Sequence, residues 1–118
     1  MTVPALTALL LGARYRSRVT EGAVQDDIAS CLTSAGTTFE REVELGPTDR
    51  IDFMIGTVGL EVKVQGSANQ VLRQLQRYAQ SPRVTELVLF TMRAQLGHAM
   101  PETLSEKPLT IVRYWAGI

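Results

Sequence analysis

Apolar and polar residues follow two periods along the chain, and each period predicts one kind of element. A period near 3.6 residues predicts helices over about residues 4–15, 21–35 and 68–80. Alternation at every second residue, or a short unbroken apolar run, predicts strands over about residues 37–45, 50–55, 60–64, 85–92 and 109–115. The order helix, helix, three strands, helix, strand, strand indicates an α/β fold whose mixed central sheet is flanked by helices.

The second and third predicted strands form a hairpin. Gly56 and Gly59 bracket the connection, where they are expected to supply positive φ angles. A loop centred on residues 57–58 sets the register of the two strands. The expected cross-strand pairs are Ile55 with Leu60, Met54 with Glu61, and Asp52 with Lys63.

This register places chemistry on one face of the hairpin. Because side chains alternate across a strand, Asp52, Glu61 and Lys63 share a face. Cross-strand neighbours lie about 5 to 8 Å apart, so one divalent ion could bridge both acids. In the structural alternative, the hairpin is a solvated face on which Asp52 pairs with Lys63. The opposite face is expected to be apolar and to carry Ile51, Phe53, Leu60, Val62 and Val64.

Length and composition exclude several kinds of protein. The 118 residues suit a single domain over 1–118, with a helical extension over 1–18 and a core over about 20–115. One cysteine, Cys31, excludes an internal disulfide and a Cys-rich metal site, and one histidine, His98, argues against a His-based zinc site. The formal net charge is zero, so any nucleic-acid binding must depend on local arginines.

The chain also lacks the sequence signals of a membrane protein. No segment approaches the roughly 18 consecutive apolar residues that span a bilayer. The apolar run over residues 5–11 is short and has no cationic start, so it is a poor signal peptide. We therefore expect a soluble cytoplasmic protein with no membrane partner.

The element order, with an acid on one strand and Glu-x-Lys on the next, resembles the αβββαβ core of the PD-(D/E)xK nuclease superfamily. The residues that match are Asp52 and Glu61-Val62-Lys63, and the resemblance covers about residues 21–92. Ile51 stands where the family usually has a proline. The resemblance implies a restriction-endonuclease-like fold.

Two other features are similar to family elements. Gln74 and Tyr78 match the Gln-x-x-x-Tyr motif of the RecB-like and phage-exonuclease branches, where these residues could orient the lysine, the attacking water or a phosphate. Alternatively, Tyr78 packs in the core beside Val71 and Leu75 while Gln74 is solvated.

Glu21, in the first turn of the second predicted helix, matches an acid that family members often carry into the metal site. Its alternative role is to stabilise the helix dipole.

The resemblance implies a metal-dependent nuclease that hydrolyses phosphodiester bonds of DNA. Mg²⁺ or Mn²⁺ would be held by Asp52, Glu61 and the carbonyl of Val62, with Glu21 as a further ligand. Lys63 would position or deprotonate the attacking water and stabilise the developing charge.

DNA contacts are expected from arginines near the hairpin and the helices. One of these candidates, Arg16, forms a cluster in the sequence with Arg14 and Arg18. Each arginine has the alternative role of a solvated surface charge. With no separate DNA-reading module in the sequence, we expect selectivity for structure or strand ends rather than for base sequence. The candidate contacts are Arg73, Arg77, Arg50, Arg41 and Arg16.

Two other classes of protein stay open from the sequence. The chain could be a non-catalytic nucleic-acid-binding or assembly module on the same fold, or an unrelated α/β interaction protein whose hairpin acids are surface pairs. The leucine-rich first helix and the last strand with Trp115 could form a homodimer or a higher oligomer, although core packing would use the same residues.

Overall fold

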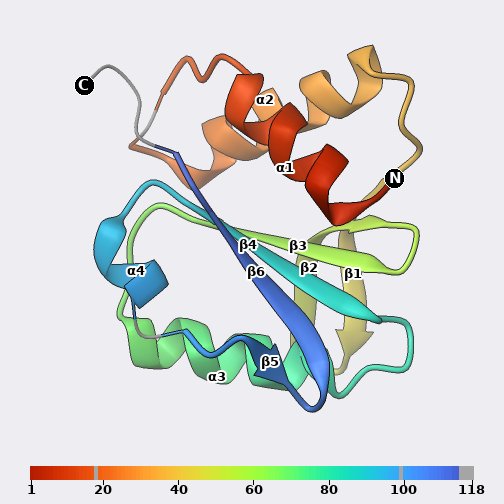
Figure 1. The fold of residues 1–118 in the computed structure, drawn as a ribbon, viewed down its shortest axis with the longest axis vertical. Coiled ribbons are helices and arrows are strands. Elements are labelled where there is room, and N and C mark those ends of the chain that lie inside the picture. The colour runs from red at the N-terminus through yellow and green to blue at the C-terminus, as the bar shows by residue number, and fades with distance from the viewer. Residues whose placement is uncertain (18, 99, 115–118) are drawn as a thin grey trace.

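A computed structural model describes residues 1–17, 19–98 and 100–114 of the protein. Helices and strands follow one another as shown in Figure 1. In chain order they are α1 (Val3–Gly12), α2 (Glu21–Ser34), β1 (Glu40–Gly46), β2 (Asp49–Ile55), β3 (Val58–Lys63), α3 (Ala68–Ala79), β4 (Glu86–Thr91), α4 (Ala94–His98), β5 (Thr103–Leu104) and β6 (Lys107–Arg113).

The strands of the described residues form one mixed sheet in the order β1-β2-β3-β4-β6-β5. β1, β2 and β3 form an antiparallel meander. The crossover through α3 makes β4 parallel to β3, and β6 is parallel to β4. The α/β class, the mixed sheet and the order of the long elements are therefore confirmed, whereas α4 and the short β5 were not predicted.

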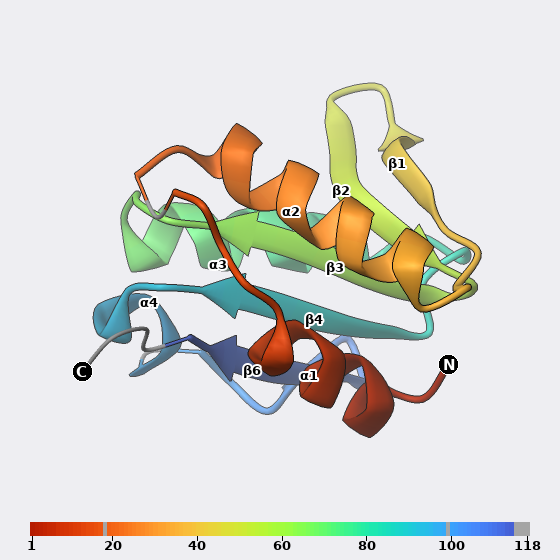
Figure 2. The same ribbon diagram turned by 90° about the horizontal axis from the view of Figure 1, so that it is seen from above.

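Helices cover both faces of the sheet (Figures 1 and 2). α1 and α2 bury their apolar side chains on one face, and α3 and α4 bury theirs on the other. The central strands β3 and β4 are consequently buried on both faces, which explains the unbroken apolar run in β4.

α1 is part of this core. Its residues Val3, Leu6 and Leu10 are buried beside the α2 and β6 side chains. None of the helices in the described ranges is both long and apolar enough to span a bilayer.

The predicted hairpin register is wrong by two residues. Gly56, with φ of 62°, and Thr57 form the turn, and β3 begins at Val58. Because a shift of two residues preserves the alternation of side chains, the polar residues stay on a common face. The pairs are Phe53 with Leu60, Met54 with Gly59, and Ile55 with Val58.

Gly59 is needed for packing rather than for a turn. It lies inside β3, and a Cβ atom there would come within 2.6 Å of Ile51 Cδ1 and 3.0 Å of Leu87 Cδ2. Ile51 therefore lies on the α3 side of the sheet, which corrects its predicted place beside Phe53 on the other face. Two residues apart in one strand, Ile51 and Phe53 face opposite cores, so β2 loses its regular alternation at Asp52.

Several predicted boundaries also move. α1 ends at Gly12 instead of continuing to Tyr15, and the Tyr15 hydroxyl donates a hydrogen bond to the Leu10 carbonyl at 2.6 Å. β1 begins at Glu40 instead of Thr37. Trp115, at the predicted end of the last strand, lies outside the described residues.

Candidate functional site

The candidate residues gather at the edge of the sheet where β3 and β4 end. Asp52 of β2 reaches this edge through hydrogen bonds to β3, and the first turn of α2 lies at the same edge (Figure 2). Ligands of α/β proteins commonly bind at the carboxyl ends of parallel strands. From β2 and β3 this edge receives Asp52, Glu61 and Lys63.

Asp52 and Glu61 are linked by reciprocal hydrogen bonds. The Asp52 backbone nitrogen donates to Glu61 Oε1 at 3.2 Å, and the Val62 backbone nitrogen donates to Asp52 Oδ2 at 2.8 Å. The last backbone pair of the two strands is Phe53 with Leu60. Beyond it, carboxylate side chains replace backbone carbonyls as acceptors, so both acids are held firmly in place.

Burial makes the acid pair unusual. Glu61 is only 2% exposed, and this burial, followed by the negative charge of Asp52, raises its pKa to about 8. Burial also raises the pKa of Asp52. At neutral pH, Glu61 therefore keeps its proton beside the Asp52 carboxylate. A bound cation would favour release of that proton.

Lys63 lies where the sequence predicts but has a different partner. Its Nζ atom is 3.5 Å from Glu61 Oε2, and its side chain is 20% exposed. The solvated cross-strand pair of Lys63 with Asp52, considered as the structural alternative, is not formed. Instead, a half-buried amine faces a buried acid.

The Gln-x-x-x-Tyr helix brings a hydroxyl to the acid pair. Tyr78 is fully buried among the α3-side core residues, as its packing alternative requires. Its hydroxyl nevertheless donates to the Arg50 carbonyl at 2.8 Å and lies 3.4 Å from Glu61 Oε2. Gln74 Nε2 donates to the same hydroxyl at 2.7 Å. Gln74 and Tyr78 thus hold the start of β2 beside Glu61.

Glu21 reaches the site from α2. Its Oε1 atom accepts a hydrogen bond from the Val64 backbone nitrogen at 3.2 Å, just beyond the end of β3. Its charge adds to the effect of burial in raising the pKa of Asp52. Among residues 1–17, 19–98 and 100–114, however, no three acids, histidines or cysteines are close enough to form a metal-ligand cluster. Of the predicted metal ligands, Asp52 and Glu61 therefore lie together. Glu21 is instead hydrogen-bonded to the Val64 backbone nitrogen beside them.

Three of the five candidate arginines are held by acids. Arg77 Nε lies 2.8 Å from Asp49, and Arg41 Nη2 lies 3.1 Å from Asp26. Arg41 also lies over the Phe53 ring, 5.4 Å from its centroid.

Arg16 is the third of these, and its partner is an acid that the sequence reasoning missed. Asp27 is buried, and its two oxygens accept from Arg16 Nε at 2.7 Å and from the Arg16 backbone nitrogen at 2.8 Å. The available signal was the position of Asp27 beside Ile28 on the buried stripe of the helix.

The other two candidates are exposed. Arg50 and Arg73 have no acid within ion-pair distance among the residues that the structure describes. Arg18 lies outside those residues.

Leucines of α1 serve the protein's own core. Leu6 and Leu10 are buried, and Leu11 is 45% exposed. Their burial accounts for the leucine-rich pattern without a partner, and a homodimer or higher oligomer stays a prediction.

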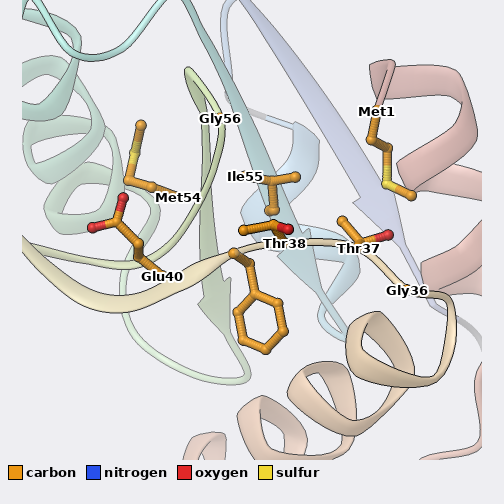
Figure 3. Close-up of a pocket in the computed structure, with 9 residues that line it drawn as sticks. Met1, Gly36, Thr37, Thr38, Glu40, Met54, Ile55 and Gly56 are labelled. Atoms are coloured by element: carbon orange, nitrogen blue, oxygen red, sulfur yellow. The ribbon is translucent and has the colours of Figure 1, made fainter.

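A cavity of about 520 Å³ lies away from the acids, between the turn after β2 and the segment that precedes β1 (Figure 3). Thr37, Phe39, Met54 and Ile55 contribute to its walls. The acid in its wall, Glu40, is paired with Arg83 at 3.2 Å. None of the candidate site residues lines this cavity.

The chain matches no protein-family model, no curated protein and no solved structure. The likeness to PD-(D/E)xK nucleases therefore stays a prediction, and it depends on the residues described above.

Proposed function

We propose that this protein is a metal-dependent nuclease with a restriction-endonuclease-like core, which hydrolyses phosphodiester bonds of DNA. The observation that carries the proposal is the buried pair of Asp52 and Glu61, contacted by Lys63 where β2 and β3 stop pairing. A buried acid with a raised pKa reduces stability at neutral pH, and such acids are concentrated at functional sites. The order α2, β1, β2, β3, α3, β4 also agrees with the αβββαβ core.

The donor set fits a hard divalent cation. Asp52 Oδ2 and Glu61 Oε1 accept hydrogen bonds from the backbone, so a cation would bind at Asp52 Oδ1 and at Glu61 Oε2. At Glu61 Oε2 it would compete with Lys63 Nζ, which lies 3.5 Å away. Carboxylate oxygens together with the Val62 carbonyl are the ligands that Mg²⁺ and Mn²⁺ prefer. When bound, the metal would polarise the phosphate and lower the pKa of a water ligand.

The chain's own residues would orient and stabilise the reacting groups. Lys63 would hold the attacking water and place positive charge beside the phosphoryl oxygens at Nζ. Tyr78 and Gln74 would fix Glu61 and the Arg50 backbone. The exposed guanidinium groups of Arg50 and Arg73 would contact the DNA backbone.

We propose selectivity for DNA structure or strand ends. The candidate DNA contacts that carry no acid partner in the described part of the chain, Arg50 and Arg73, lie near the acid pair and can reach phosphates. Contacts to phosphates alone fix position without reading base sequence.

A cleavage assay tests the proposal. Single-stranded, linear duplex, nicked and four-way-junction DNA would be incubated with Mg²⁺, Mn²⁺ or EDTA. We expect metal-dependent cleavage that is lost in Asp52→Asn and Lys63→Met. The matched control is Lys107→Met, because Lys107 is the other lysine of the chain and bonds to the Ser81 carbonyl far from the acids.

A non-catalytic nucleic-acid-binding module is the second candidate. It is favoured by the contact of Lys63 Nζ with Glu61 Oε2, at 3.5 Å, and by the lack of a three-acid cluster among the described residues. DNA binding without cleavage of any substrate, together with calorimetry that detects no Mn²⁺ binding, would identify this module and reject the nuclease.

A further inference from the structure

One arginine outside the sequence-based set lies in register with the active-site lysine. Lys63 of β3 pairs with Thr91 of β4, and Thr91 pairs with Arg113 of β6. Because neighbouring strands lie about 4.8 Å apart, the backbones of Lys63 and Arg113 are separated by about 10 Å. All three residues end their strands at the edge that carries the acid pair.

The three side chains also share a face of the sheet. Glu61, two residues before Lys63, contacts Tyr78 of α3. Leu89 and Ile111, two residues before Thr91 and Arg113, belong to the core that α3 and α4 cover. Since side chains two apart in a regular strand point the same way, Lys63 and Arg113 both face the α3 and α4 side.

The Arg113 side chain packs against Gly97 of α4. A Cβ atom at Gly97 would lie 2.5 Å from Arg113 Nε and 3.0 Å from Nη2. The guanidinium group therefore lies directly against the α4 backbone, in space that any larger residue would fill. α4 follows β4 at the same edge of the sheet (Figures 1 and 2).

Arg113 has no competing acid in the described part of the chain. Arg77, Arg41 and Arg16 each contact an aspartate, whereas no carboxylate of residues 1–17, 19–98 or 100–114 lies within 4 Å of the exposed Arg113 side chain. A guanidinium group that is placed by packing rather than by an ion pair keeps its donors for an anion, and its planar fork matches phosphate.

We propose that Arg113 binds a backbone phosphate next to the scissile one, and that Gly97 positions its guanidinium group for this contact. The proposal rests on the proposed nuclease function and adds a second phosphate site on the β6 side of Lys63. The substrate strand would then run across the carboxyl ends of β3, β4 and β6.

Binding of labelled single-stranded and four-way-junction DNA, measured by fluorescence anisotropy without divalent metal, tests the site on uncut DNA. We expect Arg113→Gln to weaken binding about tenfold. On single-stranded DNA it should also reduce the slope of log affinity against log salt by about 0.7, the value for one lost phosphate contact. Arg83→Gln is the control for the loss of one exposed arginine, because Arg83 precedes β4 at the opposite edge, where it pairs with Glu40.

Gly97→Ala tests the positioning role. The variant keeps the charge of Arg113 but displaces its guanidinium group, so binding should weaken in the wild-type background and not change further in an Arg113→Ala background. If Gly97→Ala fails to fold, Arg113→Lys replaces it; this variant keeps the charge but loses the fork, and affinity should fall between wild type and Arg113→Gln.

The outcomes separate the two proposals. If the wild type binds and cleaves DNA while Arg113→Gln and Arg83→Gln have the same affinity and salt slope, the Arg113 site is rejected and the nuclease stands. If the wild type neither binds nor cleaves any of the DNA substrates, the nuclease is rejected together with the site.

Discussion

The Val62 backbone nitrogen donates a 2.8 Å hydrogen bond to the Asp52 carboxylate just past the point where β2 and β3 stop pairing. In the opposite direction, the Asp52 backbone nitrogen donates to the Glu61 carboxylate. Each acid therefore stabilises the strand that carries the other. Because these contacts use one oxygen of each carboxylate, the remaining oxygens are held in a defined position.

Two substitutions at Asp52 should separate its structural role from its chemical one. Asp52→Ala removes the acceptor of Val62 N and should lower the free energy of unfolding by about 1 to 3 kcal/mol. Asp52→Asn keeps an acceptor oxygen, so its free energy of unfolding should fall by less. Urea denaturation measures the difference, and calorimetry should show Mn²⁺ binding lost in both variants. Equal destabilisation would contradict the role of the carboxylate in joining the strands.

Glu61 should make the protein less stable as pH rises. Its folded-state pKa of about 8 lies above the ordinary value of 4.5, so its contribution to stability is fully present below pH 4.5 and is lost as pH rises through 8. Glu61→Gln removes this dependence. At pH 9 the variant should melt at least about 5 °C above the wild type, with little difference at pH 5.

Thermal melts of Glu61→Gln at the two pH values need a control at a solvated acid. Glu102→Gln serves, because Glu102 is exposed. Its melting temperature should differ from that of the wild type by the same amount at pH 5 and pH 9. If the difference in melting temperature between Glu61→Gln and the wild type is also the same at pH 5 and pH 9, Glu61 is not a buried protonated acid.

Two tyrosine-to-phenylalanine variants should separate stability from activity. Tyr78→Phe and Tyr15→Phe each remove a hydroxyl bonded to a backbone carbonyl, at Arg50 and Leu10 respectively. Each should lower the free energy of unfolding by about 1 kcal/mol. Only the Tyr78 hydroxyl lies beside Glu61, so only Tyr78→Phe should reduce cleavage or Mn²⁺ affinity, by about 10- to 100-fold. Equal activity in the two variants would show that Tyr78 only packs.

Gly59→Ala should disrupt the point where β2 changes face. The added methyl group would meet Ile51 and Leu87, and overpacking of this kind costs about 1 to 3 kcal/mol. Gly22→Ala on α2 meets no atom within 4 Å and should raise stability by about 0.4 to 1 kcal/mol. The two melting temperatures should therefore shift in opposite directions. If Gly59→Ala leaves the melting temperature unchanged, the Ile51 side chain can move to another position.

The sequence predicted what depends on local pattern. The long helices and strands follow from periodicity. Alternation also predicted that Asp52, Glu61 and Lys63 lie together, and they do, although the alternation of β2 itself breaks at Asp52. The partnership of Gln74 and Tyr78 follows from a spacing of four residues on a helix.

What the sequence could not predict depends on contacts between distant segments. Gly59 was assigned to the turn because glycine favours turns, whereas Ile51 and Leu87 explain its presence in β3. Arg113 was overlooked because its significance comes from Gly97 of a five-residue helix, too short to show a period. Neither relationship is visible until the sheet brings these residues together.

The packing of α1 against β6 affects the timing of folding. Leu6 and Leu10 share a core with Val112, which lies close to the other end of the described chain. During synthesis these leucines emerge from the ribosome long before the strand that completes their core. We therefore expect the nascent chain to expose an apolar helix until β6 emerges, which makes this late step the period of greatest risk of aggregation.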